Sequence, residues 1–252
     1  MAVVATHSAL LKNGGNLVDL LKSLKFSQKE SEHLSKYLKQ FGIYRRKLDF
    51  ETIVQEFQEK RYWQKVRRFE IKYRKLWSGP DVPIYILPMD QGSEGAMSGV
   101  SFKDKIFLFL TTGVTDKKLE ALFIHEYHHC VRMNELLKKK KKFNLLDSIV
   151  FEGLAEQAVK EYCGKEYVAD WCNRYDSDQL KKMWKASILP NLEVEKGVRR
   201  HEHILYGKGF SPSMMGYAVG YFLIQEWLKK HEDSTKKMLM KSSETFILQE
   251  NE

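Results

Sequence analysis

Hydrophobic positions recur at helical spacing along the first 79 residues of the chain. A capping box of Ser27 and Glu30 marks the start of one helix, and Gly42 is placed to end it. Four apolar side chains of this helix fall on one face: Leu34, Tyr37, Leu38 and Phe41. A second helix is expected to begin after Asp49 and to continue toward Trp77. We therefore expect a helical N-terminal part.

Short apolar runs that suit strands follow Gly79-Pro80. Residues 82–87 are rich in β-branched and aromatic side chains and are bounded by prolines, and residues 106–110 form a second run. The segment between them, Met89–Gly99, contains three glycines and is predicted to be a functional loop. Helical spacing then returns over residues 115–137, 145–163, about 177–188 and 213–230. The pattern predicts an α+β fold, with a small sheet followed by a mainly helical half.

The length of 252 residues suits one large domain, or a catalytic domain with a helical extension. We divide the chain into a helical N-terminal part (1–79), a catalytic domain (80–230) and a C-terminal tail (231–252). The most apolar late stretch, Met214–Leu228, is too short to cross a bilayer, so no membrane span is expected. Three cysteines without a C-x-x-C pair, and no signal-peptide pattern, favour a cytoplasmic protein.

The chain is basic, because its 42 Lys and Arg residues exceed its 33 Asp and Glu residues by nine. Such a charge would suit a nucleic-acid partner, an anionic surface or an acidic substrate. The excess is spread along the chain, and its densest run, Lys138–Lys142, follows a helical segment. No nucleic-acid motif accompanies it, so nucleic-acid binding is kept only as an alternative.

An H-E-x-x-H motif, His125–His129, lies within the apolar helical window Leu119–Met133. Helix positions four apart lie one turn above one another, so His125 and His129 can bind one ion while Glu126 stands beside it. A catalytic zinc ion polarises a carbonyl and lowers the pKa of water, and a neighbouring carboxylate accepts the proton. We expect Zn²⁺ on the two histidines, with Glu126 as the general base.

A catalytic zinc ion normally has three protein ligands. The metzincin pattern would need a histidine at position 135, which is Glu135, so that pattern is excluded. The other common solution is a carboxylate from the next helix, and Glu152 begins the segment Glu152–Glu156 there. Glu156 would then accept a hydrogen bond from a ligand imidazole. The alternative is an exposed acidic helix face.

Amide hydrolysis also needs a donor that stabilises the oxyanion. His203, Tyr206 and Tyr217 are the candidates, with no order among them, and packing is the alternative role for each. The strand at residues 106–110 could pair with an extended peptide if it lies at an edge of the sheet, whereas an interior strand could not.

These motifs resemble the bacterial "predicted Zn-dependent protease" family. The shared features are His125–His129 with Arg132 after it, Glu152–Glu156, Tyr206-Gly207 and the G-Y-x-x-G-Y segment Gly216–Tyr221. The resemblance covers roughly residues 79–229 and implies a thermolysin-like zincin fold of the gluzincin type. It indicates a zinc metallopeptidase that acts on a peptide or protein substrate. The alternatives are a zinc hydrolase of a non-peptide bond and a non-catalytic binding protein with a zincin fold.

Overall fold

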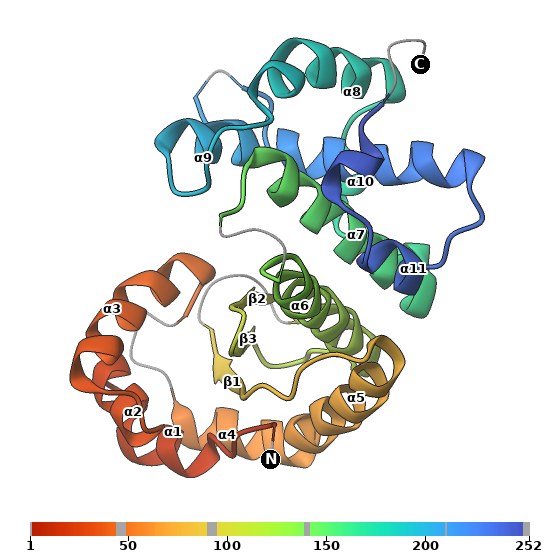
Figure 1. Cartoon of the computed structure of the whole chain (residues 1–252). Helices are drawn as coiled ribbons and strands as arrows, with labels where there is room; N and C mark the ends of the chain where they lie inside the picture. The colour runs from red at the N-terminus through yellow and green to blue at the C-terminus, as the bar shows by residue number, and fades with distance from the viewer. Residues whose placement is uncertain (1, 44–48, 90–94, 139–141, 210, 249–252) are drawn as a thin grey trace. The chain divides into compact units, whose positions relative to one another are not determined.

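The computed structural model describes residues 2–43, 49–89, 95–138, 142–209 and 211–248 (Figure 1). It has the expected α+β composition, with N-terminal helices, a three-stranded sheet and a mainly helical second half. The chain divides into two compact units, Met1–Cys130 and Val131–Glu252. The expected domain boundaries after residues 79 and 230 therefore fall inside these units.

The sheet of the first unit has the strand order β1-β3-β2. Strand β1 (Ile84–Pro88) runs parallel to β3 (Ile106–Leu110), and β2 (Met97–Ser101) runs antiparallel to β3. Because β3 is paired on both sides, residues 106–110 do not form an edge of the sheet that could bind a peptide. The alternative of an interior strand is confirmed. Strand β2 overlaps the expected loop Met89–Gly99, of which residues 90–94 lie outside the described residues.

The outer edge of β1 is covered by the start of the chain. The Val4 amide donates to the Ile84 carbonyl at 2.9 Å, and the Ile84 amide donates to the Ala2 carbonyl at 2.7 Å. The opposite edge of the sheet belongs to β2. Among the described residues, no strand pairs with the outer side of β2.

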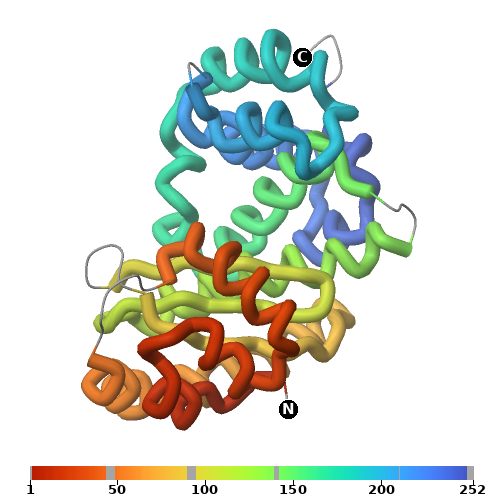
Figure 2. The backbone as a smooth tube through the Cα atoms, turned by 90° about the vertical axis from the view of Figure 1, so that its left-hand side faces the viewer, coloured from red at the N-terminus to blue at the C-terminus, as the bar shows by residue number. Residues whose placement is uncertain are grey.

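The two faces of the sheet differ in chemistry, because alternate strand residues point to opposite sides. On one face, Tyr85 stacks on Phe107, and both rings pack against Phe26. Helices α1–α3 lie over this aromatic face (Figure 2). On the other face, Gly99 and Ser101 of β2 lie against Glu126 of α6 (Asp116–Leu136). The general-base candidate is thus next to the sheet.

In the described part of the chain, the α-helices before the sheet are α1 (His7–Asn13), α2 (Leu17–Ser23), α3 (Gln28–Leu38), α4 (Phe50–Glu59) and α5 (Tyr62–Trp77). The Ser27 and Glu30 capping box is confirmed at the start of α3, and Gly42 adopts the expected positive φ of 85°. The Asp49 side chain caps α4, as expected. The single helix expected from there to Trp77 is broken at Arg61, whose φ of 54° ends the helical conformation.

The second unit is built around α7 (Leu145–Cys163), which has the bounds expected from the sequence. The other helices of this unit are α8 (Ser177–Met183), α9 (Arg199–Tyr206), α10 (Met215–Lys230) and α11 (Thr235–Leu239), with a π-helical turn at Trp184–Ile188. Among the described residues, no helix is both long and apolar enough to cross a membrane.

Helices α7 and α10 approach each other closely through two glycines. A Cβ atom on Gly153 would lie 2.2 Å from the Gly220 carbonyl oxygen, and one on Gly220 would lie 2.1 Å from the Ile149 carbonyl oxygen. Neither position therefore has room for a side chain, and both glycines serve the same helix contact.

The segment expected to be a tail contributes to the core of the second unit. Met238 and Phe246 belong to an apolar cluster with Leu146, Val150 and Leu154 of α7. The buried Arg132 guanidinium donates to the carbonyls of Met238, Leu239 and Lys241 and to the Ser243 hydroxyl. Residues 249–252 of the expected tail lie outside the described residues.

Candidate metal centre

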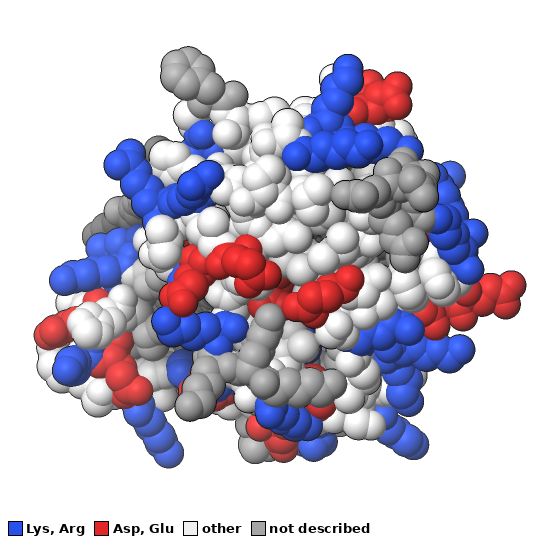
Figure 3. Space-filling view, turned by 45° about the horizontal axis from the view of Figure 1, so that its top comes forward, with Lys and Arg blue, Asp and Glu red and all other residues white. Residues whose placement is uncertain are grey.

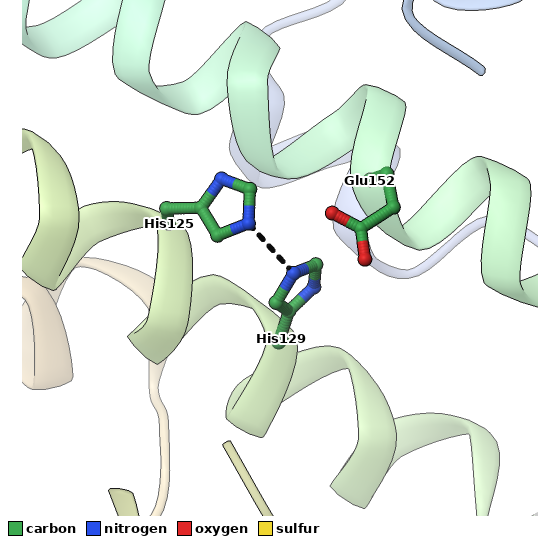
Figure 4. A group of neighbouring side chains, drawn as sticks. All are labelled: His125, His129 and Glu152. Atoms are coloured by element: carbon green, nitrogen blue, oxygen red, sulfur yellow. Dashed lines mark hydrogen bonds between the residues drawn. The ribbon is translucent and has the colours of Figure 1, made fainter. Parts of the chain in front are cut away.

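Helix α6 brings the two histidines of the H-E-x-x-H motif together. The Nε2 atoms of His125 and His129 lie 2.9 Å apart, and the ring planes are nearly perpendicular, at 88° (Figure 4). Both side chains are partly exposed, whereas the neighbouring His128 is fully buried against the edge of Trp77. The two rings therefore present nitrogen atoms to one point, as a shared metal ion requires.

Glu152 completes a group of three possible ligands. One ligand atom from each of His125, His129 and Glu152 lies within 4.8 Å of the other two (Figure 4). All three residues are partly exposed. Two imidazoles and a carboxylate are a donor set of catalytic zinc sites, in which a fourth position stays open. The group could therefore hold a metal ion.

Glu126 is held separately, against strand β2. Its side chain is buried, and the Ser101 hydroxyl shares its one proton between Oε2 of Glu126, at 2.5 Å, and the main-chain oxygen of Glu126, at 2.7 Å. No sequence pattern pointed to Ser101, because the preceding residues, Met89–Gly99, were expected to form a loop. A strand predicted over Met97–Ser101 would have been the signal that pointed to Ser101.

Glu156 lies one turn beyond Glu152 on α7 and is buried. Its Oε2 accepts a hydrogen bond from the Ala169 amide at 2.8 Å and lies 3.9 Å from the Cys172 sulfur. Burial, and then the charge of Glu156, raise the pKa of the Cys172 thiol. These contacts fasten the turn Asp170–Asn173 to α7. The expected hydrogen bond from Glu156 to a ligand imidazole stays a prediction.

Two of the three oxyanion candidates lie together. The rings of Tyr206 and Tyr217 are 5.6 Å apart, and the edge of Trp171 packs against Tyr217. Burial raises the pKa of Tyr206; its hydrogen bond with Tyr217 lowers that pKa, and the nearby charge of Glu152 raises it. Tyr206 thus lies close enough to Glu152 to sense its charge.

The third candidate, His203, has a different neighbour. The Arg199 Nε atom donates to His203 Nε2 at 3.2 Å on the partly exposed surface of α9. His201, two residues earlier, is buried, and its Nε2 lies 2.8 Å from the Ser148 hydroxyl oxygen. The structure therefore groups the two tyrosines.

The fold and the group of two histidines and a glutamate define an α+β protein with a possible metal centre of the zinc-hydrolase type. The family model "Predicted Zn-dependent protease (DUF2268)" matches residues 62–248. The chain belongs to this family, which confirms the resemblance and extends it to α5 and to the C-terminal segment.

Two proteins of Bacillus subtilis (strain 168) are similar to the chain. "Uncharacterized protein YjaZ" is 34% identical over 258 aligned positions, which cover 98% of each chain. "Uncharacterized protein YjfC" is 26% identical over 142 positions, which cover 52% of this chain and 47% of that protein. No solved structure matches the chain.

Proposed function

We propose that the protein is a zinc-dependent peptidase with a thermolysin-like zincin fold, and that His125, His129 and Glu152 hold the ion. The observation that carries this proposal is the convergence of these three donor groups within 4.8 Å, with an acid directly after the first histidine. The family description supports the same activity. The donor set also fits zinc better than magnesium or calcium, which prefer oxygen ligands.

A zinc ion held there would polarise the peptide carbonyl and make water acidic enough to lose a proton near neutral pH. Glu126 would accept that proton and then donate it to the leaving nitrogen. The hydroxyls of Tyr206 and Tyr217 are our preferred oxyanion donors, because their rings lie together and the charge of Glu152 acts on Tyr206. His203 is the weaker candidate, since Arg199 already donates to its ring.

A peptide substrate would bind along the edge of β2. This strand is paired with β3 on one side, so its other side can offer backbone donors and acceptors to an extended chain. Such pairing recognises the peptide backbone more than its side chains. We therefore propose a peptide or protein substrate with little side-chain selectivity.

The test combines metal analysis with digestion of an unbiased peptide library, read by mass spectrometry. The purified protein should contain one zinc ion per chain, and a chelator should abolish cleavage that added zinc restores. Glu126→Gln should keep zinc and lose nearly all cleavage, whereas His125→Ala should lose zinc. His33→Ala, which changes an exposed histidine on α3, is the matched control.

The outcomes separate the alternatives. Zinc binding without peptide cleavage would favour a hydrolase of another bond or a non-catalytic zincin-fold binding protein. Full zinc content in a folded His125→Ala variant would refute the metal site. Nucleic-acid binding has less support, because Lys and Arg side chains are scattered over the face in Figure 3, with Asp and Glu among them. A cytoplasmic location stays part of the proposal and rests on the cysteine pattern.

A further inference from the structure

The hydroxyl of the last residue of strand β2 shares its one proton between two oxygen atoms of Glu126. The Ser101 hydroxyl lies 2.5 Å from Oε2 of Glu126 and 2.7 Å from its main-chain oxygen. One hydroxyl thus contacts both the carboxylate and the helix backbone from which that side chain extends. A contact of this kind restricts the torsion angles between the two groups.

Gly99 determines the space open to the same carboxylate on a second side. It lies two residues before Ser101 and points to the same face of the sheet. A Cβ atom on Gly99 would lie 2.5 Å from Cγ of Glu126 and 2.6 Å from its Oε1. The glutamate side chain therefore occupies the space that any other residue at position 99 would fill. Its Oε2 contacts Ser101, and its Oε1 lies over Gly99.

The strand that carries these two residues is firmly placed. Gly99 pairs with Leu108 and Ser101 with Ile106, both fully buried residues of β3. The connection between the strands is closed by a hydrogen bond from the Phe102 amide to the Lys105 carbonyl at 2.8 Å. The hydroxyl of Ser101 is consequently presented from a rigid element, which is what precise positioning of a catalytic group requires.

We propose that Ser101 and Gly99 are positioning residues for the general base. Ser101 holds Oε2 of Glu126, and Gly99 leaves room for Oε1, which is the oxygen that takes the proton from water. This inference rests on the proposed function, since it assigns parts to the same reaction. Its basis is geometric: a glutamate with three side-chain torsions is confined to one orientation before substrate arrives.

The kinetic test uses Ser101→Ala, Ser101→Thr and the control Ser8→Ala. Ser8 is an exposed serine of α1, so the same hydroxyl is removed outside the strand that carries Gly99 and Ser101. Ser101→Ala should keep the zinc content and KM of the wild type and lower kcat about 10- to 100-fold, as expected for a lost hydrogen bond to a charged group. Ser101→Thr, which keeps the hydroxyl, should restore most of kcat. Ser8→Ala should change neither constant.

A second measurement does not depend on activity. Crystal structures of the zinc-loaded wild type and of Ser101→Ala should show one conformer of Glu126 in the first and a rotated or divided carboxylate in the second. An unchanged Glu126 conformer in Ser101→Ala would overturn the positioning role. If the carboxylate is rotated in Ser101→Ala but kcat equals that of the wild type, the positioning of Glu126 by Ser101 has no catalytic importance.

These measurements also separate this inference from the proposed function. If the wild type cleaves no peptide, the peptidase proposal fails, while the conformer of Glu126 still decides whether Ser101 positions it. Gly99→Ala adds an independent variant, because its new methyl group should displace the carboxylate even with Ser101 intact. A Gly99→Ala protein that folds, binds zinc and keeps wild-type kcat would refute the part assigned to Gly99.

Discussion

The crossing of α7 and α10 has no room for a side chain at Gly220, so Gly220→Ala tests how α7 is positioned. The new Cβ atom would lie 2.1 Å from the Ile149 carbonyl oxygen, whereas ordinary contact begins at 3.4 Å. The helices would therefore have to separate by about 1.3 Å (3.4 − 2.1). They cannot avoid the clash by a small slide, because Gly153 contacts the Gly220 carbonyl from the other side.

The stability change follows from two opposing effects. Overpacking a dense interior costs about 1–3 kcal/mol, and the upper end applies here because the nearest atoms belong to a helix backbone. Alanine in a helix is favoured over glycine by about 1 kcal/mol, which offsets part of that cost. We expect Gly220→Ala to lower the free energy of unfolding by about 2 kcal/mol.

The assay is denaturant unfolding, with Gly15→Ala as the matched control. Gly15 undergoes the same chemical change, yet nothing lies within 4 Å of its new methyl group, so its stability should change little. Zinc affinity is the second measurement. Glu152 directly precedes Gly153, and metal sites tolerate ligand displacements of only about 0.2 Å. Gly220→Ala should therefore weaken zinc binding at least about tenfold.

Two results would refute this reasoning. If Gly220→Ala and Gly15→Ala unfold at the same denaturant concentration, the close approach of the helices is not a strained contact. If Gly220→Ala is destabilised but binds zinc as tightly as the wild type, the α7 and α10 crossing does not determine the position of Glu152.

Three further predictions concern other residues. Arg132→Met should lower the free energy of unfolding by about 3–5 kcal/mol, because it leaves three carbonyls without their donor; a loss below about 1 kcal/mol in denaturant unfolding would contradict this. Burial, and then the charge of Lys196, hold the pKa of His201 below its usual value. As the pH drops, the unfolded chain therefore takes up a proton at this histidine before the folded protein does, so wild-type stability should fall below about pH 6.5. His201→Asn should show a smaller fall in stability between pH 7 and 5 in thermal melts. Glu152→Ala should reduce zinc affinity more than Glu156→Ala in zinc titrations, and the reverse order would exchange their roles.

Strand β2 shows why part of the sheet could not be read from the sequence. Strands β1 and β3 are continuous apolar runs because both of their faces are buried. In β2, by contrast, the positions that face α6 include Gly99 and Ser101, which must be small or polar to admit the Glu126 carboxylate. The contact with the proposed catalytic acid thus removes the alternating apolar pattern by which a strand is recognised.

The candidate site likewise contains some contacts that the sequence predicts and others that it does not. The spacing of His125 and His129 is a local helical period, and the sequence therefore predicts their approach directly. Glu152 could be proposed because a carboxylate on the following helix is a common third ligand. The contact of Ser101 with Glu126 spans 25 residues and leaves no local pattern. The pairing of Tyr206 with Tyr217 similarly depends on how α9 meets α10.

The buried guanidinium of Arg132 has a consequence for the order of events during biosynthesis. Its partners lie 106 to 111 residues later, near the end of the described chain. Until those residues leave the ribosome, only water can accept the hydrogen bonds of the guanidinium, and the helix that carries both histidines lacks the partners of Arg132. Contacts of such long sequence separation form late. We therefore expect nascent chains that end before residue 238 to remain protease-sensitive after α6, and full-length chains to gain resistance there on release.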